Sequence, residues 1–332
     1  MPMTELATLF NSIQQQTGQQ AEAGSYAGIA IPDSSHHIAK DKRGRPVILL
    51  SAQVTEVRPA SIVLENLRIE HGIRCNINQR GMGVVDDRFT VVQCQSEDPI
   101  LQRCFLDLCE TILNGLTESP TQRAIADQID RLVVLFRVME QPSRRSIQGL
   151  WGELALIVHS RDPIAMARAW HNDTCERYDF AAGEQRLEVK TSADRSRIHF
   201  LSHEQANPPD GVQCVIASLF VEPSTGGRTL GSVWDEARRL LNPIPELRLR
   251  IDEVSFAALG GGWREARNYG FDAYLAMSSL EFYDVRDIPR IDGDIPNGIS
   301  DIRFRTDLAV GTRIAVSRRP TQPLVALLTS KP

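Results

Sequence analysis

The sequence lacks the motifs that would assign it to several common enzyme classes. No GxxxxGK[ST] or GxGxxG motif occurs, so neither a P-loop nor a Rossmann nucleotide site is predicted. No GxSxG motif is present, which argues against a serine hydrolase. The six cysteines form no CxxC pair, so a zinc ribbon is not expected. We interpret these cysteines as reduced, mostly buried thiols.

Long apolar runs and an excess of positive charge are also missing. No stretch approaches the ~18 apolar residues of a membrane span. The first residues, MPMTELATLF, lack the basic and apolar segments of a secretory signal, so a cytoplasmic protein is expected. The formal net charge of −5 excludes a binder coated in positive charge, but it leaves room for a local basic groove.

The 332 residues are enough for two domains or one elaborated domain. Strand-like segments rich in β-branched residues give way to helical periodicity near residue 100, and both types alternate afterwards. We therefore predict a mixed α/β (α+β) protein with a β-rich N-terminal domain at 1–97, a helical connector at 98–142, a core domain at 143–245 and a mixed C-terminal region at 246–332.

The most informative segment runs from Asp179 to Lys190 and is typical of a β-hairpin. Gly183 at the first position of a two-residue turn suits type II′. This register places Asp179 directly across from Glu188, and directly opposed residues have Cβ atoms roughly 4.5–5.5 Å apart. Two carboxylates this close repel each other unless a proton or a cation lies between them.

A hard divalent cation is the natural occupant, because Mg²⁺ prefers one or two carboxylates together with water and phosphate oxygens. Lys190 lies two residues beyond Glu188 and therefore shares its strand face. There it can orient a metal-bound water and stabilise charge on a phosphate. These three residues suffice for metal-assisted phosphodiester hydrolysis. Taken alone, they fit equally a surface hairpin with a cross-strand Glu–Lys ion pair.

The GLWGEL segment carries a further acidic candidate. Leu150, Trp151 and Leu154 belong to an apolar helical stripe, and Glu153 falls at the edge of that stripe. Gly152 leaves room for the close approach of another backbone, although glycine costs a helix about 1 kcal/mol. Glu153 is thus either a carboxylate that reaches a neighbouring active site or an exposed residue on a solvated flank.

Four segments in this order resemble the PD-(D/E)XK motif proteins of bacteria, which are restriction-endonuclease-like. They are GLWGEL, DF, EVKTS and the Ser-x-x-Gln at Ser202–Gln205, and the similarity is strongest over residues 145–205. The resemblance implies a mixed central sheet flanked by helices. The sequence departs from the pattern at Tyr178, where the motif has proline, and at Ala206, where a large apolar residue is usual.

The resemblance also implies a role for each matching residue. Asp179 and Glu188 would ligate the metal together with the backbone carbonyl of Val189. Lys190 would be the catalytic lysine. Glu153 would be the additional acidic residue and would act on the metal directly or through water.

DNA is the substrate that the resemblance implies, and basic or polar side chains are needed to contact its phosphates. Arg186 shares the strand face of the predicted site. Each candidate is otherwise an ordinary solvated side chain. The candidates are Gln205, Arg186, Arg195, Arg197, Arg144, Arg145, Lys42, Arg43 and Arg45.

The leading interpretation is a Mg²⁺-dependent DNA endonuclease of a restriction or phage-defence system, with Mn²⁺ as a substitute metal. Its partners would be duplex DNA, a DNA methyltransferase or ATPase of the same system, and a second copy of the chain. A non-catalytic DNA-binding subunit and a repair nuclease for flaps or mismatches remain open alternatives. The intact Asp179, Glu188 and Lys190 favour catalysis.

Overall fold

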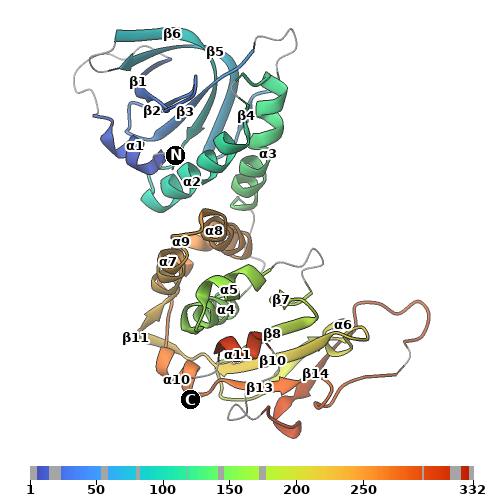
Figure 1. Ribbon diagram of the computed structural model, residues 1–332. Helices are drawn as coiled ribbons and strands as arrows, with labels where there is room; N and C mark the ends of the chain where they lie inside the picture. Colours follow the sequence, from blue (N-terminus) through green and yellow to red (C-terminus); the bar gives the residue numbers. More distant parts are fainter. Residues whose placement is uncertain are drawn as a thin grey trace. The chain divides into compact units, whose positions relative to one another are not determined.

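The chain forms two compact units, Met1–Gln141 and Pro142–Pro332 (Figure 1). The computed structural model describes residues 6–14, 24–53, 59–79, 83–117, 119–140, 146–171, 177–293, 295–314 and 323–328. Both helices and sheets occur, which confirms the mixed α/β class. Among the described helices, none is long and apolar enough to cross a membrane.

The first unit is built on a sheet with the strand order β1-β2-β3-β6-β5-β4. Its strands are β1 Ser25–Ala30, β2 His37–Lys40, β3 Pro46–Ser51, β4 Ile62–Val63, β5 Leu67–Gln79 and β6 Gly83–Cys94. Because β1 also pairs with β5 in parallel, five of these strands close into a ring. Apolar side chains that include Val47, Ile77 and Phe89 form its core.

Helices α1 Leu6–Ser12, α2 Pro99–Gly115 and α3 Gln122–Val138 belong to the same unit. α2 begins after Asp98, whose side chain accepts hydrogen bonds from two backbone N–H groups of the first turn, and proline occupies an early helical position. The predicted connector at 98–142 therefore falls with the β-rich region by its contacts. The predicted four-part division remains a prediction about domains.

A four-stranded mixed sheet, ordered β13-β10-β8-β7, lies at the centre of the second unit (Figure 1). Its strands are β7 Phe180–Ala182, β8 Gln185–Ser192, β10 Gln213–Phe220 and β13 Glu281–Asp284. β8 and β10 run parallel, whereas β7–β8 and β10–β13 are antiparallel. Six consecutive residues of β10 are buried, as expected for a central strand covered on both faces.

The third strand after the first core helix does not join this sheet. β9 Ile198–Ser202 instead pairs with β14 Arg303–Asp307 in a separate antiparallel ribbon. Because β7 and β10 occupy both edges of β8, β9 does not pair with the strand that precedes it in the sequence. A second short pair joins β11 Pro223–Thr229 to β12 Gly270–Phe271.

Helix α4 Ile147–His159 packs against β8 and against α7 Leu230–Leu240. Its N-cap is Ser146, whose hydroxyl accepts the N–H of Gly149 at 3.0 Å. At Gly152 an added Cβ would lie 2.5 Å from Thr191 Cγ2 of β8, so glycine permits the close crossing of helix and strand. This crossing brings Glu153 next to the strand that carries Glu188.

The remaining helices pack on the sheet, on the ribbon or on other helices. They are α5 Pro163–Ala169, α6 His203–Ala206, α8 Pro245–Leu259, α9 Trp263–Ala266, α10 Ala273–Ser278 and α11 Pro323–Leu328, with short 3₁₀ turns at Gly260–Gly262 and Leu308–Val310. Five cysteines are free and buried, as predicted, and Cys175 lies outside the described residues.

Candidate active site

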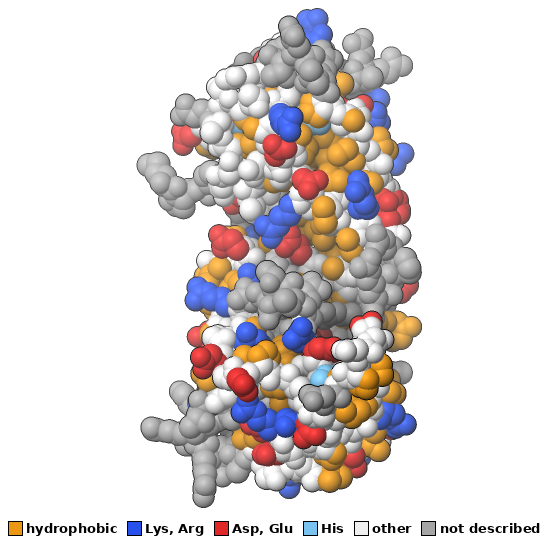
Figure 2. All heavy atoms as spheres, turned by 90° about the vertical axis from the view of Figure 1, so that its right-hand side faces the viewer, with side chains coloured by type: hydrophobic (Ala, Val, Ile, Leu, Met, Phe, Trp, Pro, Cys, Tyr) orange, Lys and Arg blue, Asp and Glu red, His pale blue; other side chains and the backbone are white. Residues whose placement is uncertain are grey.

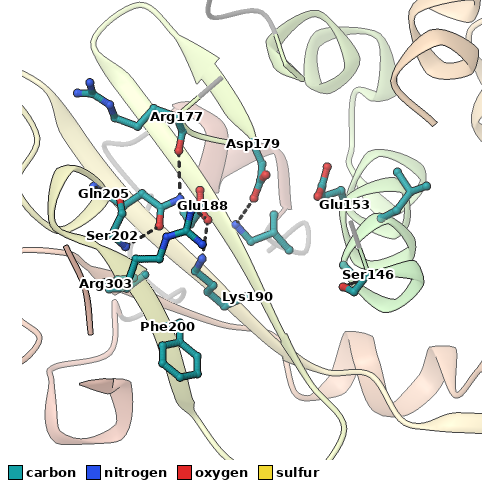
Figure 3. A pocket seen from close by; sticks show the side chains of 14 residues that line it. Ser146, Glu153, Arg177, Asp179, Glu188, Lys190, Phe200, Ser202, Gln205 and Arg303 are labelled. Atoms are coloured by element: carbon teal, nitrogen blue, oxygen red, sulfur yellow. Dashed lines mark hydrogen bonds and ion pairs between the residues drawn. The ribbon is translucent and has the colours of Figure 1, made fainter. Parts of the chain in front are cut away.

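One cavity of about 580 Å³ in the second unit gathers the residues that the motifs singled out (Figure 3). Its lining includes Glu153 from α4, Asp179 from the start of the hairpin, and Glu188 and Lys190 from β8. The ribbon and α6 supply the opposite wall. The other lining residues are Ser146, Gly149, Leu150, Arg177, Val189, Phe200, Leu201, Ser202, Gln205 and Arg303.

The hairpin has the predicted register. Phe180 pairs with Leu187 and Ala182 pairs with Gln185, and Gly183 has a φ of 55°. Asp179 lies just before the first strand. Its Oδ2 accepts the N–H of Val189 at 2.8 Å, so the carboxylate is fixed beside β8 at the cavity wall.

Glu188 and Lys190 meet on one face of β8, as the strand period predicted. Glu188 is only 4% exposed, and its Oε1 accepts hydrogen bonds from Lys190 Nζ at 2.7 Å and from Gln205 Nε2 at 2.8 Å. Both residues of this ion pair belong to β8, and its carboxylate is buried. The structure therefore excludes the alternative of a surface hairpin with a cross-strand ion pair.

Gln205 is the amide that joins α6 to this pair. Besides Glu188, its Nε2 contacts the carbonyl oxygen of Arg177 at 3.1 Å, and its Oε1 accepts the N–H of Ser202 at 3.2 Å. The Ser202 hydroxyl in turn accepts the N–H of Gln205, which completes a capping box at the start of α6. The Ser-x-x-Gln motif thus has a local capping role and also reaches the site.

Tyr178, which stands where the motif has proline, is a structural residue. Its ring packs in a core cluster with Leu201, Cys214 and Tyr283, and its hydroxyl donates to the carbonyl oxygen of Glu204 at 3.0 Å. Burial raises the pKa of the Tyr178 phenol well above its usual value. The departure from the motif therefore ties the hairpin to α6.

Glu153 is a buried carboxylate. It is 5% exposed, and its Oε2 lies 2.9 Å from both Trp170 Nε1 and His171 Nε2. This burial excludes the alternative of an exposed glutamate on a solvated flank. Both rings come from the end of α5, and the indole N–H of Trp170 donates to the carboxylate and holds it in place.

His171 is a site residue that the sequence reasoning missed. Ligand atoms of Glu153, His171 and Asp179 all lie within 4.8 Å of one another, which makes these residues a group able to hold a metal ion. Its backbone has a φ of 41°, and its N–H donates to the carbonyl oxygen of Asp179 at 2.9 Å. No motif spacing signals this histidine, because its contact with Glu153 depends on how α5 packs against α4.

The donor set fits a divalent cation. Ligands bound at about 2.1 Å lie roughly 3 to 4 Å apart around one ion, so only a small contraction of the group is needed. Two carboxylate ligands suit Mg²⁺ or Mn²⁺, and an imidazole adds affinity for Mn²⁺ over Mg²⁺. Glu188 belongs to the Lys190 and Gln205 contacts instead, so its predicted sharing of one cation with Asp179 stays a prediction, as does ligation by the Val189 carbonyl.

Several predicted DNA-contacting arginines of the second unit have protein partners. Arg186 donates to the carbonyl oxygens of Gly183 and Gln185 at 2.7 and 2.9 Å. Arg195 forms an ion pair with Glu222. Arg197 is 9% exposed at its side chain and lies 2.9 Å from Glu281. These contacts oppose a DNA-binding role for Arg197, and the role stays a prediction for all three arginines.

The basic loop of the first unit is partly internal. Arg45 is largely buried and pairs with Asp41 at 2.7 Å, whereas Arg43 lies 3.7 Å from Glu97 at the surface and Lys42 is exposed. Arg144 and Arg145 lie outside the described residues. On the face drawn in Figure 2, the coloured basic and acidic side chains are interspersed and form no broad basic area.

Comparison with known families agrees with the geometry. The model of a family described as "Putative PD-(D/E)XK family member, (DUF4420)" matches residues 6–309. No curated protein and no solved structure was found to match the chain.

Proposed function

The chain belongs to the DUF4420 family of PD-(D/E)XK proteins, and on this premise we propose that it is a divalent-metal-dependent nuclease that hydrolyses phosphodiester bonds in DNA. The observation that carries the proposal is the convergence of Glu153, Asp179, Glu188 and Lys190 on one cavity. The two glutamates are almost fully buried there. Carboxylates and a lysine that are gathered in one cavity and held there by hydrogen bonds are typical of functional sites, so their convergence supports a catalytic site.

Each residue has a distinct task under this proposal. Asp179, held by the N–H of Val189, and Glu153, held by the indole N–H of Trp170, would hold the cation together with His171. Lys190, fixed by Glu188, would stabilise negative charge on the phosphate and orient the attacking water. When bound, the metal supplies Lewis-acid polarisation of the phosphate.

Gln205 would position Glu188, and thereby Lys190, from the opposite wall. Glu188 would thereby hold Lys190 toward the cavity, and it would be a further carboxylate ligand for the cation.

The mixed sheet with α4 against β8 supports a restriction-endonuclease-like core, which we propose for residues 143–245, with β13 of the C-terminal region as an edge strand of the sheet. A restriction or phage-defence setting, with a DNA methyltransferase, an ATPase or a second copy of the chain as partner, is proposed on the sequence resemblance alone. Mg²⁺ is the proposed metal, and Mn²⁺ is expected to replace it.

Plasmid cleavage tests the proposal. Purified protein is incubated with methylated and unmethylated plasmid in Mg²⁺ or Mn²⁺, beside Lys190→Met and the control Arg239→Met, which removes a positive charge from an exposed ion pair with Glu236. We expect Lys190→Met to lose roughly 10²- to 10³-fold in rate while still binding DNA, and Arg239→Met to cut normally.

The alternative outcomes are separable. Equal cleavage by Lys190→Met and wild type would remove Lys190 from the chemistry. Tight duplex binding without cleavage by the wild type would instead favour the non-catalytic DNA-binding subunit.

A further inference from the structure

The β9–β14 ribbon presents an exposed aromatic side chain beside the candidate active site. Phe200 is 63% exposed and lines the cavity together with Ser202 of the same strand and Arg303 of the partner strand (Figure 3). Single exposed apolar residues are ordinary on protein surfaces. The combination of an aromatic face, neighbouring cations and a catalytic cavity is what calls for an explanation.

The ribbon's register places positive charge around this ring. Phe200 pairs with Arg305, and Ser202 pairs with Arg303. Cross-strand partners share a sheet face, and both arginines are exposed. The Arg305 guanidinium lies 5.7 Å from the centre of the Phe200 ring, within the range of a cation–π contact.

The ribbon carries its positive charge toward one end. Asp307 is the acidic residue of the two strands, and it pairs with Ile198 at the end opposite to Arg303. The end that lines the cavity is therefore the basic one. Arg177, which is also exposed, lines the same cavity and adds a third cation, whereas Glu204 of α6 is a partly opposing charge.

The opposite face of the ribbon is anchored in the protein. Leu201 is buried in the same core cluster as Tyr178 and Ile216, and His199 is buried with its Nε2 2.9 Å from the Ser218 hydroxyl. These buried residues fix the strand that carries Phe200. It is therefore organised before any ligand arrives, which lowers the entropic cost of binding.

We propose that Phe200 is a stacking platform for an unpaired base, with Arg303 and Arg305 contacting the flanking phosphates, so that the scissile strand enters the cavity single-stranded. This inference rests on the proposed nuclease function and names its substrate class. Aromatic rings stack on any base, and arginines beside them contact the backbone, which is the chemistry of single-strand binding surfaces. A nuclease with this platform would favour DNA with flaps, mismatches or frayed ends over intact duplex.

Binding without divalent metal tests the platform separately from cleavage. In EDTA, the full-length protein is titrated into a short single-stranded DNA that carries 2-aminopurine and into the matching duplex. We expect tighter binding to the single strand and quenching of 2-aminopurine on stacking. Phe200→Ala is expected to weaken single-strand binding roughly 5- to 100-fold and to abolish the quenching.

Further variants separate the ring from the charges. Phe200→Leu keeps an apolar side chain and should still fail to quench, whereas Phe200→Tyr should bind and quench as the wild type does. The control Tyr274→Leu removes an aromatic ring that is 85% exposed on α10 and should change nothing. Arg303→Gln and Arg305→Gln are each expected to reduce the slope of log affinity against log salt by about 0.7.

The outcomes distinguish the stacking platform from the proposed nuclease function. Unchanged binding and quenching in Phe200→Ala, or wild-type preference for duplex, overturns the platform and leaves the nuclease intact. Loss of quenching in Phe200→Ala, together with full cleavage by Lys190→Met, supports the platform and overturns the catalytic assignment. Absence of binding to either DNA in EDTA overturns the platform, and plasmid cleavage with divalent metal then decides the nuclease function separately.

Discussion

Gly152 sets the distance between α4 and β8, and its replacement by alanine is the most quantitative test of how the site is built. The added Cβ would lie 2.5 Å from Thr191 Cγ2, well inside the 3.4 Å at which ordinary contacts begin. Thr191 is β-branched and stiff at χ1, so the methyl group does not move away cheaply. The helix and the strand must therefore separate by up to about 1 Å.

The expected change in the free energy of unfolding for Gly152→Ala is the difference between two contributions. Overpacking costs about 1–3 kcal/mol, and replacing a helical glycine by alanine returns about 1 kcal/mol. Gly152→Ala should thus lower the free energy of unfolding by about 0–2 kcal/mol. Thr191→Ser removes the obstructing methyl group and alone should cost about 1 kcal/mol. In the double variant the overpacking disappears, so the two substitutions should couple favourably by about 1–3 kcal/mol.

Tryptophan fluorescence during urea unfolding is the suitable assay. All four tryptophans of the chain belong to the second unit, so the signal reports the unfolding of that unit alone. They are Trp151, Trp170, Trp234 and Trp263. Because Glu153 follows Gly152 on α4, the single variant should also bind Mn²⁺ more weakly, and the double variant should recover binding. Additive stabilities within about 0.5 kcal/mol would refute the claim that this contact fixes the helix.

Two further perturbations address the histidines. His171→Ala should weaken Mn²⁺ binding roughly 10- to 100-fold in calorimetric titrations, while His159→Ala, at an exposed position of the same unit, should leave it unchanged; equal affinity in all three proteins would exclude His171 from the metal site. Burial, and then the charges of Lys190 and Arg197, lower the pKa of His199 to about 4 in the folded protein. As the pH falls below 6.5, His199 is protonated in the unfolded chain before it is protonated in the folded protein. The neutral His199 therefore contributes fully to stability above pH 6.5, and roughly 3 kcal/mol of this stability is lost as the pH falls toward 4. His199→Gln should flatten stability over this interval, and an unaltered pH profile would contradict the assignment.

Local sequence patterns were sufficient for the hairpin. The period of two in β8 placed Glu188 and Lys190 on one face, and glycine at the first turn position selected the register that pairs Phe180 with Leu187. Both features depend on residues only a few positions apart. The apolar stripe of α4 likewise followed from helical periodicity, and Gly152 was recognised as a point of close approach.

Burial of Glu153 was beyond the same reasoning. Periodicity placed it at the edge of the stripe, where it could have been solvated. The structure buries it because α5 ends beside α4 and brings Trp170 and His171 onto its carboxylate. A partner at the end of another helix leaves no trace in the spacing of the α4 residues.

The arginines illustrate the same limit. Sequence proximity to the motif selected Arg195 and Arg197, which pair with Glu222 and Glu281 from later elements. It passed over Arg303, which lies more than a hundred residues from the hairpin and reaches the cavity because β14 pairs with β9.

By itself, the sequence determined the Asp179–Lys190 hairpin, the mixed α/β class and the family, because these depend on short-range alternation and on an ordered set of motifs. Tertiary structure alone decided that His171 joins Glu153 and Asp179, and that Phe200 and Arg303 form the cavity wall. Such groupings are set by which strand edges remain available and by which helix ends meet. They depend on packing between segments that are distant in the sequence, so the spacing of residues along the chain does not predict them.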